Sequence, residues 1–194
     1  MFEELAKYNK ILVTGPARSG THICSKMIAA DTGHRFIPEN RFNAHSVDLF
    51  RLMYSINDKF VVPCNGIISH IAEFGHENTM VICMMRTIDD IMLSGWRIKG
   101  KLHGMSYMDA RRLVLERYKI WEEQEKKGIR NWQYVMYNHL DGHHLWVPKD
   151  DRLNFKPTQT KVGEVHPPTV KKPDYSVVGR GRRESVLAQM GTRR

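Results

Sequence analysis

Two glycines near the start of the chain enclose a segment whose residue types could hold an anion. Gly15 and Gly20 are separated by four residues, which is the glycine spacing of a phosphate-binding P-loop. Between them lies Arg18, whose planar guanidinium carries a fixed positive charge and suits phosphate or sulfate oxygens. The two positions after Gly20 hold Thr21 and His22, where a nucleotide-hydrolysing P-loop holds Lys and then Ser or Thr. The segment therefore predicts a loop that binds an anion without the lysine and the Mg²⁺ ligand of that motif.

The segments on either side of this loop have the patterns of a strand and a helix. Residues 10–15 form a short apolar run that ends in glycine, and residues 19–33 have a helical period and stop at a glycine. In such an arrangement, the backbone N–H groups around Gly20 and the first turn of the helix face the same anion. The side chains that add hydrogen-bond donors to this cradle are Ser19, Thr21 and His22.

The chain as far as about Val147 alternates between apolar runs and amphipathic segments. The expected strands cover residues 10–15, 59–63, 65–71, 78–86 and 131–140, and the expected helices cover residues 19–33, 46–58, 87–98 and 106–128. In the helix over residues 46–58, the residues expected on the buried face are Leu49, Leu52, Met53 and Ile56. We predict an α/β, three-layer, P-loop-like fold in which a mainly parallel central sheet carries helices on both faces.

The last quarter of the chain has a different character. Prolines recur from Pro148 to Pro173, and no amphipathic period returns until residues 182–190. Residues 149–194 carry 11 Lys and Arg against 5 Asp and Glu. We expect one α/β domain over residues 1–147 and a Pro-rich basic extension over residues 148–194 that ends in a short helix. Such an extension could contact a protein assembly or a polyanion.

Composition excludes several other classes of protein. The 194 residues carry a net charge of +9, but the basic extension has only Phe155 and Tyr175 as aromatics, so no specific nucleic-acid motif is expected. No apolar run approaches the ~20 residues of a membrane-spanning helix, and the first ten residues lack the apolar core of a signal peptide. The three cysteines are scattered and form no CxxC pair. These features favour a cytoplasmic protein with no membrane partner.

Two motifs resemble those of the sulfotransferases that use 3′-phosphoadenosine 5′-phosphosulfate (PAPS). In that family, the loop after the first strand contains Pro, a basic residue, Ser, Gly and Thr. Residues 16–22, Pro-Ala-Arg-Ser-Gly-Thr-His, resemble it with one inserted residue and with His22 in place of a second Thr. A later strand of the family ends in Arg and is followed eight residues on by Ser, as Arg86 and Ser94 are here. The resemblance covers roughly residues 10–140, in the order and strand-to-helix context of the family.

The resemblance implies transfer of a sulfuryl group from PAPS to a hydroxyl or amine acceptor of unknown identity. The implied PAPS-binding residues are Arg18, Ser19, Gly20, Thr21, His22, Arg86 and Ser94. Among them, Arg86 and Ser94 would hold the 3′-phosphate, and Arg18 would also take part in catalysis by stabilising charge on the leaving phosphate. His70 resembles the family's general base, with Glu73 as an alternative base. No metal is expected, either here or at the histidines His139, His143 and His144.

Two other functions remain open from the sequence alone. A sulfotransferase-like domain without catalysis, acting as a structural or assembly protein, would fit the short acceptor-binding region and the basic extension. A P-loop nucleotide kinase would fit the glycine spacing but not Thr21 in place of the phosphate-binding lysine.

Overall fold

A computed structural model describes residues 1–39, 46–99 and 106–146. The described strands form one five-stranded sheet in the order β2-β3-β1-β4-β5, and all of its pairings are parallel. Their bounds are β1 Lys10–Thr14, β2 Arg35–Phe36, β3 Phe60–Pro63, β4 Thr79–Met85 and β5 Trp132–Met136. The extension expected over residues 148–194, including its terminal helix, lies outside the described residues.

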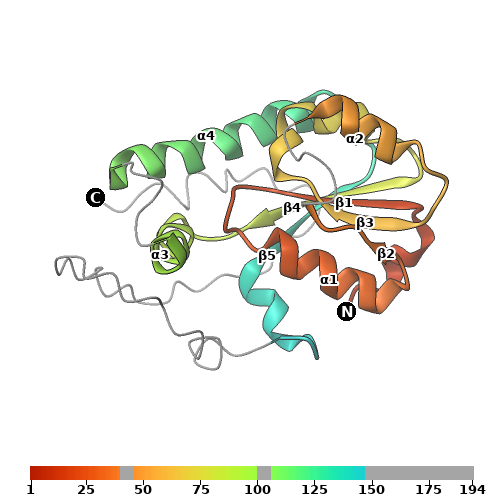
Figure 1. Ribbon diagram of the computed structural model, residues 1–194, viewed down its shortest axis with the longest axis horizontal. Helices are drawn as coiled ribbons and strands as arrows, with labels where there is room; N and C mark the ends of the chain where they lie inside the picture. The colour runs from red at the N-terminus through yellow and green to blue at the C-terminus, as the bar shows by residue number, and fades with distance from the viewer. Residues whose placement is uncertain (40–45, 100–105, 147–194) are drawn as a thin grey trace.

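Helices cover both faces of the sheet, which confirms the predicted α/β architecture (Figure 1). The α-helices are α1 Thr21–Thr32, α2 Val47–Tyr54, α3 Ile88–Lys99 and α4 Tyr107–Lys126. Shorter or tighter 3₁₀ segments are η1 Glu3–Lys7, η3 Asn65–Phe74 and η4 Tyr137–Gly142. Within the described ranges, no helix combines the length and the apolar character that a bilayer crossing requires.

The two faces of the sheet bury separate hydrophobic clusters. Because side chains alternate along a strand, Leu12 of β1 points to one face while Ile11 and Val13 point to the other. The face with Leu12 packs against α2, η3, α3 and α4, and it contains the largest buried side chains, including Trp121. The opposite face packs against η1, α1 and η4.

The central strand β1 lies between β3 and β4. Val13 of β1 is in register with Pro63 on one side and with Ile82 on the other. The chain leaving β1 passes through α1 toward β2 and β3, whereas the chain leaving β4 passes through α3 and α4 toward β5. The connections after these neighbouring strands therefore run in opposite directions, and α/β sheets commonly bind ligands at the carboxyl ends of the strands at such a reversal.

The strand expected over residues 65–71 is wrong, because this segment is the 3₁₀ helix η3. Its buried residues are Ile67, Ile68, Ile71 and Phe74, which is a helical spacing rather than the alternation of a strand. The helix leads from the carboxyl end of β3 to Gly75, shortly before β4 begins. Since β3 and β4 both run parallel to β1, η3 belongs to the crossover that returns the chain from the carboxyl end of β3 to the amino end of β4.

The buried side of α2 also differs from the expectation. Phe50 and Met53, three residues apart, face the core, and the Phe50 ring lies 4.7 Å from that of Phe74 in η3. This aromatic contact sets the rotation of the helix. Of the four residues expected to be buried, Met53 is buried, whereas Leu49 and Leu52 face solvent and Ile56, beyond the end of the helix, is exposed.

Candidate functional site

The loop between β1 and α1 has an unusual backbone conformation. Gly15 and Gly20 have φ angles of 142° and 105°, which glycine adopts freely. Arg18 has a φ of 72° and is the non-glycine residue with a positive φ within the described ranges. Such a conformation costs about 1–3 kcal/mol and persists where neighbouring groups fix it, often at a functional site.

Arg86 is one of the groups that fix this loop. It follows the last residue of β4, and its Nη1 donates a hydrogen bond to the Arg18 carbonyl oxygen at 3.0 Å. The Arg86 guanidinium also lies 3.9 Å from the centre of the Tyr137 ring, in the geometry of a cation–π contact. The residue predicted to hold a 3′-phosphate is therefore in direct contact with the loop between β1 and α1.

The side chain of Arg18 contacts Ser94, which was also predicted to hold the 3′-phosphate. Its Nη2 lies 3.4 Å from the Ser94 hydroxyl oxygen in α3. Arg18, Arg86 and Ser94 thus come together from the ends of β1 and β4 and the helix that follows β4. They gather at the carboxyl ends of these strands and place two cations beside the N-terminus of α1.

The N-terminus of α1 has no side-chain cap. Its N-cap, Gly20, has no side chain to bond the first turn, and that turn contains no acidic residue. The Cys24 N–H bonds to the Gly20 carbonyl, so the N–H groups of the preceding helical residues, Thr21 to Ile23, have no partner within the helix. Together with the helix dipole, these N–H groups favour a bound negative charge.

Thr21 occupies the position of the P-loop lysine and is 5% exposed. Its hydroxyl accepts a hydrogen bond from Asn65 Nδ2 at 3.1 Å, at the start of η3. This position therefore supplies a hydroxyl fixed to the protein, in place of a flexible ammonium that could follow a transferred phosphoryl group. Asn65 was not predicted from the sequence, because it is 44 residues away and belongs to a segment interpreted as a strand.

The structure places the other two predicted loop residues away from this cluster. Ser19 is fully buried, its N–H bonds to the Pro16 carbonyl at 3.1 Å, and its side chain lies beneath the loop, beside Gly15. His22 lies on the side of α1 toward β2, where its ring meets the Phe36 ring edge-on at 5.2 Å. Partial burial lowers the pKa of His22, and the charge of Lys26 lowers it further. A ligand role for these two side chains remains a prediction.

Tyr137 is a site residue that the sequence analysis missed. It begins η4 at the carboxyl end of β5, and its ring packs directly against Gly20. A Cβ atom at Gly20 would lie 2.8 Å from Tyr137 Cε2 and closer still to Cδ2. Glycine is therefore required here for space as well as for its φ angle. The available sequence signal was an aromatic residue at the end of the strand paired with β4.

His70 is not part of this cluster. It lies midway along η3, beyond the non-helical residue Ile67 that separates it from Asn65 at the start of this segment. Its Nδ1 is 2.8 Å from Glu73 Oε1, and the other oxygen of Glu73 pairs with Arg51 of α2 at 2.6 Å. Within the described part of the chain, the hydrogen bonds and ion pairs of His70 do not reach the loop. Its role as general base remains a prediction.

Comparisons with known proteins agree with this architecture. No family model matches the sequence, and no curated protein sequence matches it. Shikimate kinase from Bacteroides thetaiotaomicron is similar in structure, with a TM-score of 0.51, 12% identity, and coverage of 64% of this chain and 85% of that chain. The chain has the α/β fold of the P-loop kinases. Shikimate kinase from Acinetobacter baumannii in complex with shikimate has a TM-score of 0.49, 14% identity, and coverage of 68% of this chain and 86% of that chain.

The similarity in fold limits what the resemblance to the sulfotransferases can establish. The fold is shared with a shikimate kinase of 12% sequence identity, so the fold does not single out the sulfotransferases. The distinction must come from the residues of the loop. Here Thr21 and His22 replace the Lys and Ser or Thr that a P-loop uses for phosphates and Mg²⁺.

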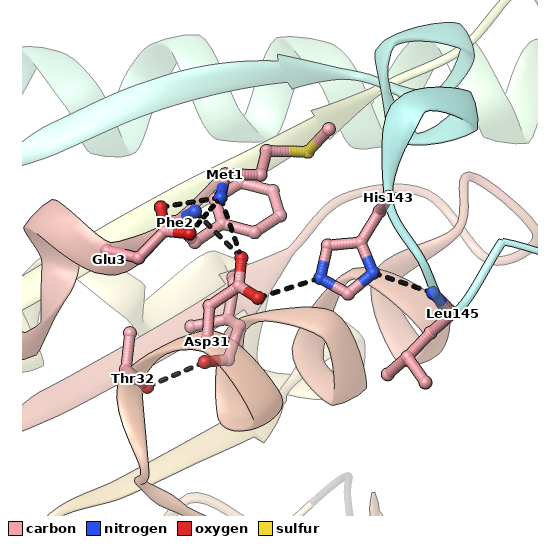
Figure 2. A network of polar contacts seen from close by, with 8 residues as sticks. Met1, Phe2, Glu3, Asp31, Thr32, His143 and Leu145 are labelled. Carbon is pink, nitrogen blue, oxygen red and sulfur yellow. Dashed lines mark hydrogen bonds and ion pairs between the residues drawn. The ribbon is translucent and has the colours of Figure 1, made fainter.

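A second polar cluster lies at the far end of α1 (Figure 2). The Asp31 carboxylate accepts hydrogen bonds from the Phe2 N–H at 2.9 Å and from His143 Nε2 at 3.0 Å. The other ring nitrogen of His143, Nδ1, accepts the Leu145 N–H at 3.0 Å, so Nε2 carries the ring hydrogen. The cluster thereby connects the start of the chain, the end of α1 and the segment after η4.

Asp31, His143 and His144 offer ligand atoms within 4.8 Å of one another. A metal ion on His143 Nε2 would have to displace the hydrogen that this atom donates to Asp31. The rings of His143 and His144 are stacked 4.3 Å apart with an interplanar angle of 27°, so their in-plane lone pairs do not converge well. The arrangement suits a hydrogen-bonded clasp between distant segments better than it suits a metal centre.

We expect Asp31→Asn to lower the free energy of unfolding by about 2 kcal/mol at pH 7. Burial acts to raise the pKa of Asp31, but hydrogen bonds to its carboxylate outweigh it, and the net pKa lies below the ordinary value. The contribution is therefore present above about pH 4 and disappears as the pH falls through the lower folded-state pKa. Urea unfolding at pH 7 and in acid would measure it.

Asp58→Asn provides a control for this measurement. Asp58 forms an ion pair with Arg35 in which both side chains are more than half exposed, so its loss should cost below about 1 kcal/mol. An equal loss of stability for Asp31→Asn at neutral and acid pH would contradict the role given to the carboxylate charge.

Proposed function

We propose that the protein binds PAPS and transfers its sulfuryl group to a hydroxyl or amine acceptor. The observation that carries this proposal is the convergence of Arg18, Arg86 and Ser94 beside the uncapped N-terminus of α1. A nucleotide with phosphate at the 3′ position and phosphosulfate at the 5′ position offers two anionic groups to such a site. Two arginines and a helix N-terminus offer matching donors.

The proposed roles follow from the position of each group. The N–H groups of the first turn of α1, the Thr21 hydroxyl and Arg18 would hold the 5′-phosphosulfate, while Arg86 and Ser94 would hold the 3′-phosphate. The acceptor atom attacks sulfur, the bond from sulfur to the 5′-phosphate oxygen breaks, and that oxygen keeps the electron pair. Arg18 would stabilise the charge that builds up there. The acceptor proton passes to a general base, for which His70 remains the prediction from sequence.

A P-loop kinase is the second candidate, and the similarity in fold to shikimate kinase favours it. The loop argues against it. Phosphoryl transfer in P-loop enzymes depends on a lysine and on Mg²⁺ held by the next hydroxyl residue. Thr21 is instead fixed to Asn65, and His22 packs against Phe36.

Calorimetric titration distinguishes these candidates. We expect adenosine 3′,5′-bisphosphate to bind without a metal and ATP to bind more weakly, with no gain from Mg²⁺. Arg18→Ala should weaken bisphosphate binding by roughly 10- to 100-fold, the range for lost hydrogen bonds to a charged group. The matched control is Arg130→Ala. Arg130 lies just before the amino end of β5, whereas the site lies at the carboxyl ends of the strands, and it pairs with exposed Glu77.

Three outcomes would be informative. Binding of the bisphosphate together with transfer from PAPS to a hydroxyl or amine acceptor supports the proposal. Binding without transfer to any acceptor of a broad panel supports a sulfotransferase-like domain that has lost catalysis. Absence of bisphosphate binding together with Mg²⁺-dependent ATP binding would replace the proposal with a kinase.

A further inference from the structure

A tyrosine from α4 holds the backbone of Arg86. The Tyr118 hydroxyl accepts a hydrogen bond from the Arg86 N–H at 3.1 Å and donates one to the Arg86 carbonyl oxygen at 3.2 Å. The Tyr118 side chain is 2% exposed and belongs to the larger hydrophobic cluster. One buried hydroxyl therefore satisfies both backbone polar groups of the same residue.

Arg86 needs such a partner because of its place in the sheet. The ladder between β1 and β4 ends at the pair of Thr14 and Cys83, and the ladder between β4 and β5 ends at the pair of Met85 and Met136. Beyond these pairs, neighbouring strands no longer supply partners to the chain leaving β4. Buried backbone groups are nearly always hydrogen-bonded, and here a side-chain hydroxyl takes the place of the missing strand.

The hydroxyl keeps both roles over the ordinary pH range. Burial raises the pKa of Tyr118 well above its usual value, and this outweighs the hydrogen bond from the Arg86 N–H, which lowers it. The proton that the hydroxyl donates to the Arg86 carbonyl oxygen is consequently retained.

We propose that Tyr118 is a positioning residue of the anion site. By fixing the backbone of Arg86, it sets the point from which the guanidinium reaches the Arg18 carbonyl oxygen and lies over Tyr137. Tyr118 acts through Arg86 and makes no contact with a ligand, because it is buried beneath the site. Its effect on nucleotide binding rests on the proposed function, whereas its effect on Arg86 does not.

The test is Tyr118→Phe, which removes the hydroxyl and keeps the ring. Tyr134→Phe is the matched control, because the Tyr134 hydroxyl also makes two hydrogen bonds, with Trp121 Nε1 at 3.1 Å and Glu125 at 3.2 Å, but does not contact Arg86. We expect amide hydrogen exchange at Arg86 to become roughly tenfold faster in Tyr118→Phe and to stay unchanged in Tyr134→Phe. Equal exchange rates at Arg86 in the parent and in Tyr118→Phe would overturn the proposal.

A double-mutant cycle tests whether Tyr118 acts through Arg86. Tyr118→Phe should weaken binding of adenosine 3′,5′-bisphosphate by roughly tenfold, and should cause no further loss when Arg86 is already alanine. A protein that is merely less stable would show equal, additive losses in both backgrounds, which would overturn the positioning role. If the parent does not bind the bisphosphate, the proposed function fails, while exchange at Arg86 still decides the role of Tyr118.

Discussion

Arg86→Ala is expected to weaken binding of adenosine 3′,5′-bisphosphate by at least about 100-fold, because it removes two functions of one side chain. The guanidinium is a proposed ligand of the 3′-phosphate. It also donates to the carbonyl oxygen of Arg18, the residue whose backbone is held at a φ of 72°. Without this bond, the loop can leave its strained conformation, so the second anion subsite weakens as well. Calorimetric titration of the purified variant measures both effects.

Adenosine 5′-monophosphate separates the two contributions of Arg86. A residue that only held the 3′-phosphate would leave binding of the monophosphate unchanged. If Arg86 also supports the loop, Arg86→Ala weakens binding of the monophosphate by roughly tenfold. Arg130→Ala, which removes the same charge at the amino end of β5, should change neither affinity. Full binding of the bisphosphate to Arg86→Ala would contradict the assignment of this site.

Gly20→Ala is expected to lower the free energy of unfolding by about 2–4 kcal/mol and to abolish anion binding at the loop. The added methyl group would overlap the Tyr137 ring, and alanine would have to adopt a φ of 105°. The ring cannot move without losing its contact with the Arg86 guanidinium. Thermal unfolding and a sulfate titration would measure the two losses.

Gly33→Ala isolates the contribution of the backbone. Gly33 ends α1 with a φ of 71°, and a Cβ atom there would meet nothing within 4 Å. Its substitution should cost only about 1 kcal/mol and should leave anion binding intact. Similar behaviour of the two glycine variants would show that the close contact between Gly20 and Tyr137 has no importance in solution.

Local patterns in the sequence predicted the central strands and the helix that follows the first of them. The run over residues 10–15, its glycine-rich turn and the following helix correspond to β1, the loop and α1. The apolar run over residues 78–86 corresponds to β4. These segments carry strong signals because a central parallel strand is buried on both faces. β2 was missed because two residues are too few to establish a pattern.

The site itself was predicted only in part. The resemblance to the sulfotransferases pointed to Arg86 and Ser94, but their contacts with Arg18 join residues 68 and 76 positions apart. Tyr137 and Tyr118 reach the site from η4 and α4. The place of Tyr137 directly after β5 was a signal that was not used, whereas nothing in the local sequence of Tyr118 indicates its contact with Arg86. Residues 65–71 were misinterpreted because three isoleucines suggested a strand, although their helical spacing was already visible.

The central place of β1 in the sheet has a consequence for how the protein folds. β1 is made first, but its partners β3 and β4 follow much later in the chain, and Arg86 is 68 residues beyond the loop carbonyl that it holds. At about 5–20 residues per second, synthesis takes roughly 3 to 14 s to cover that interval. Pairings between such distant segments also form slowly. A nascent chain therefore contains the whole glycine-rich motif for several seconds before it contains the arginine that holds the loop.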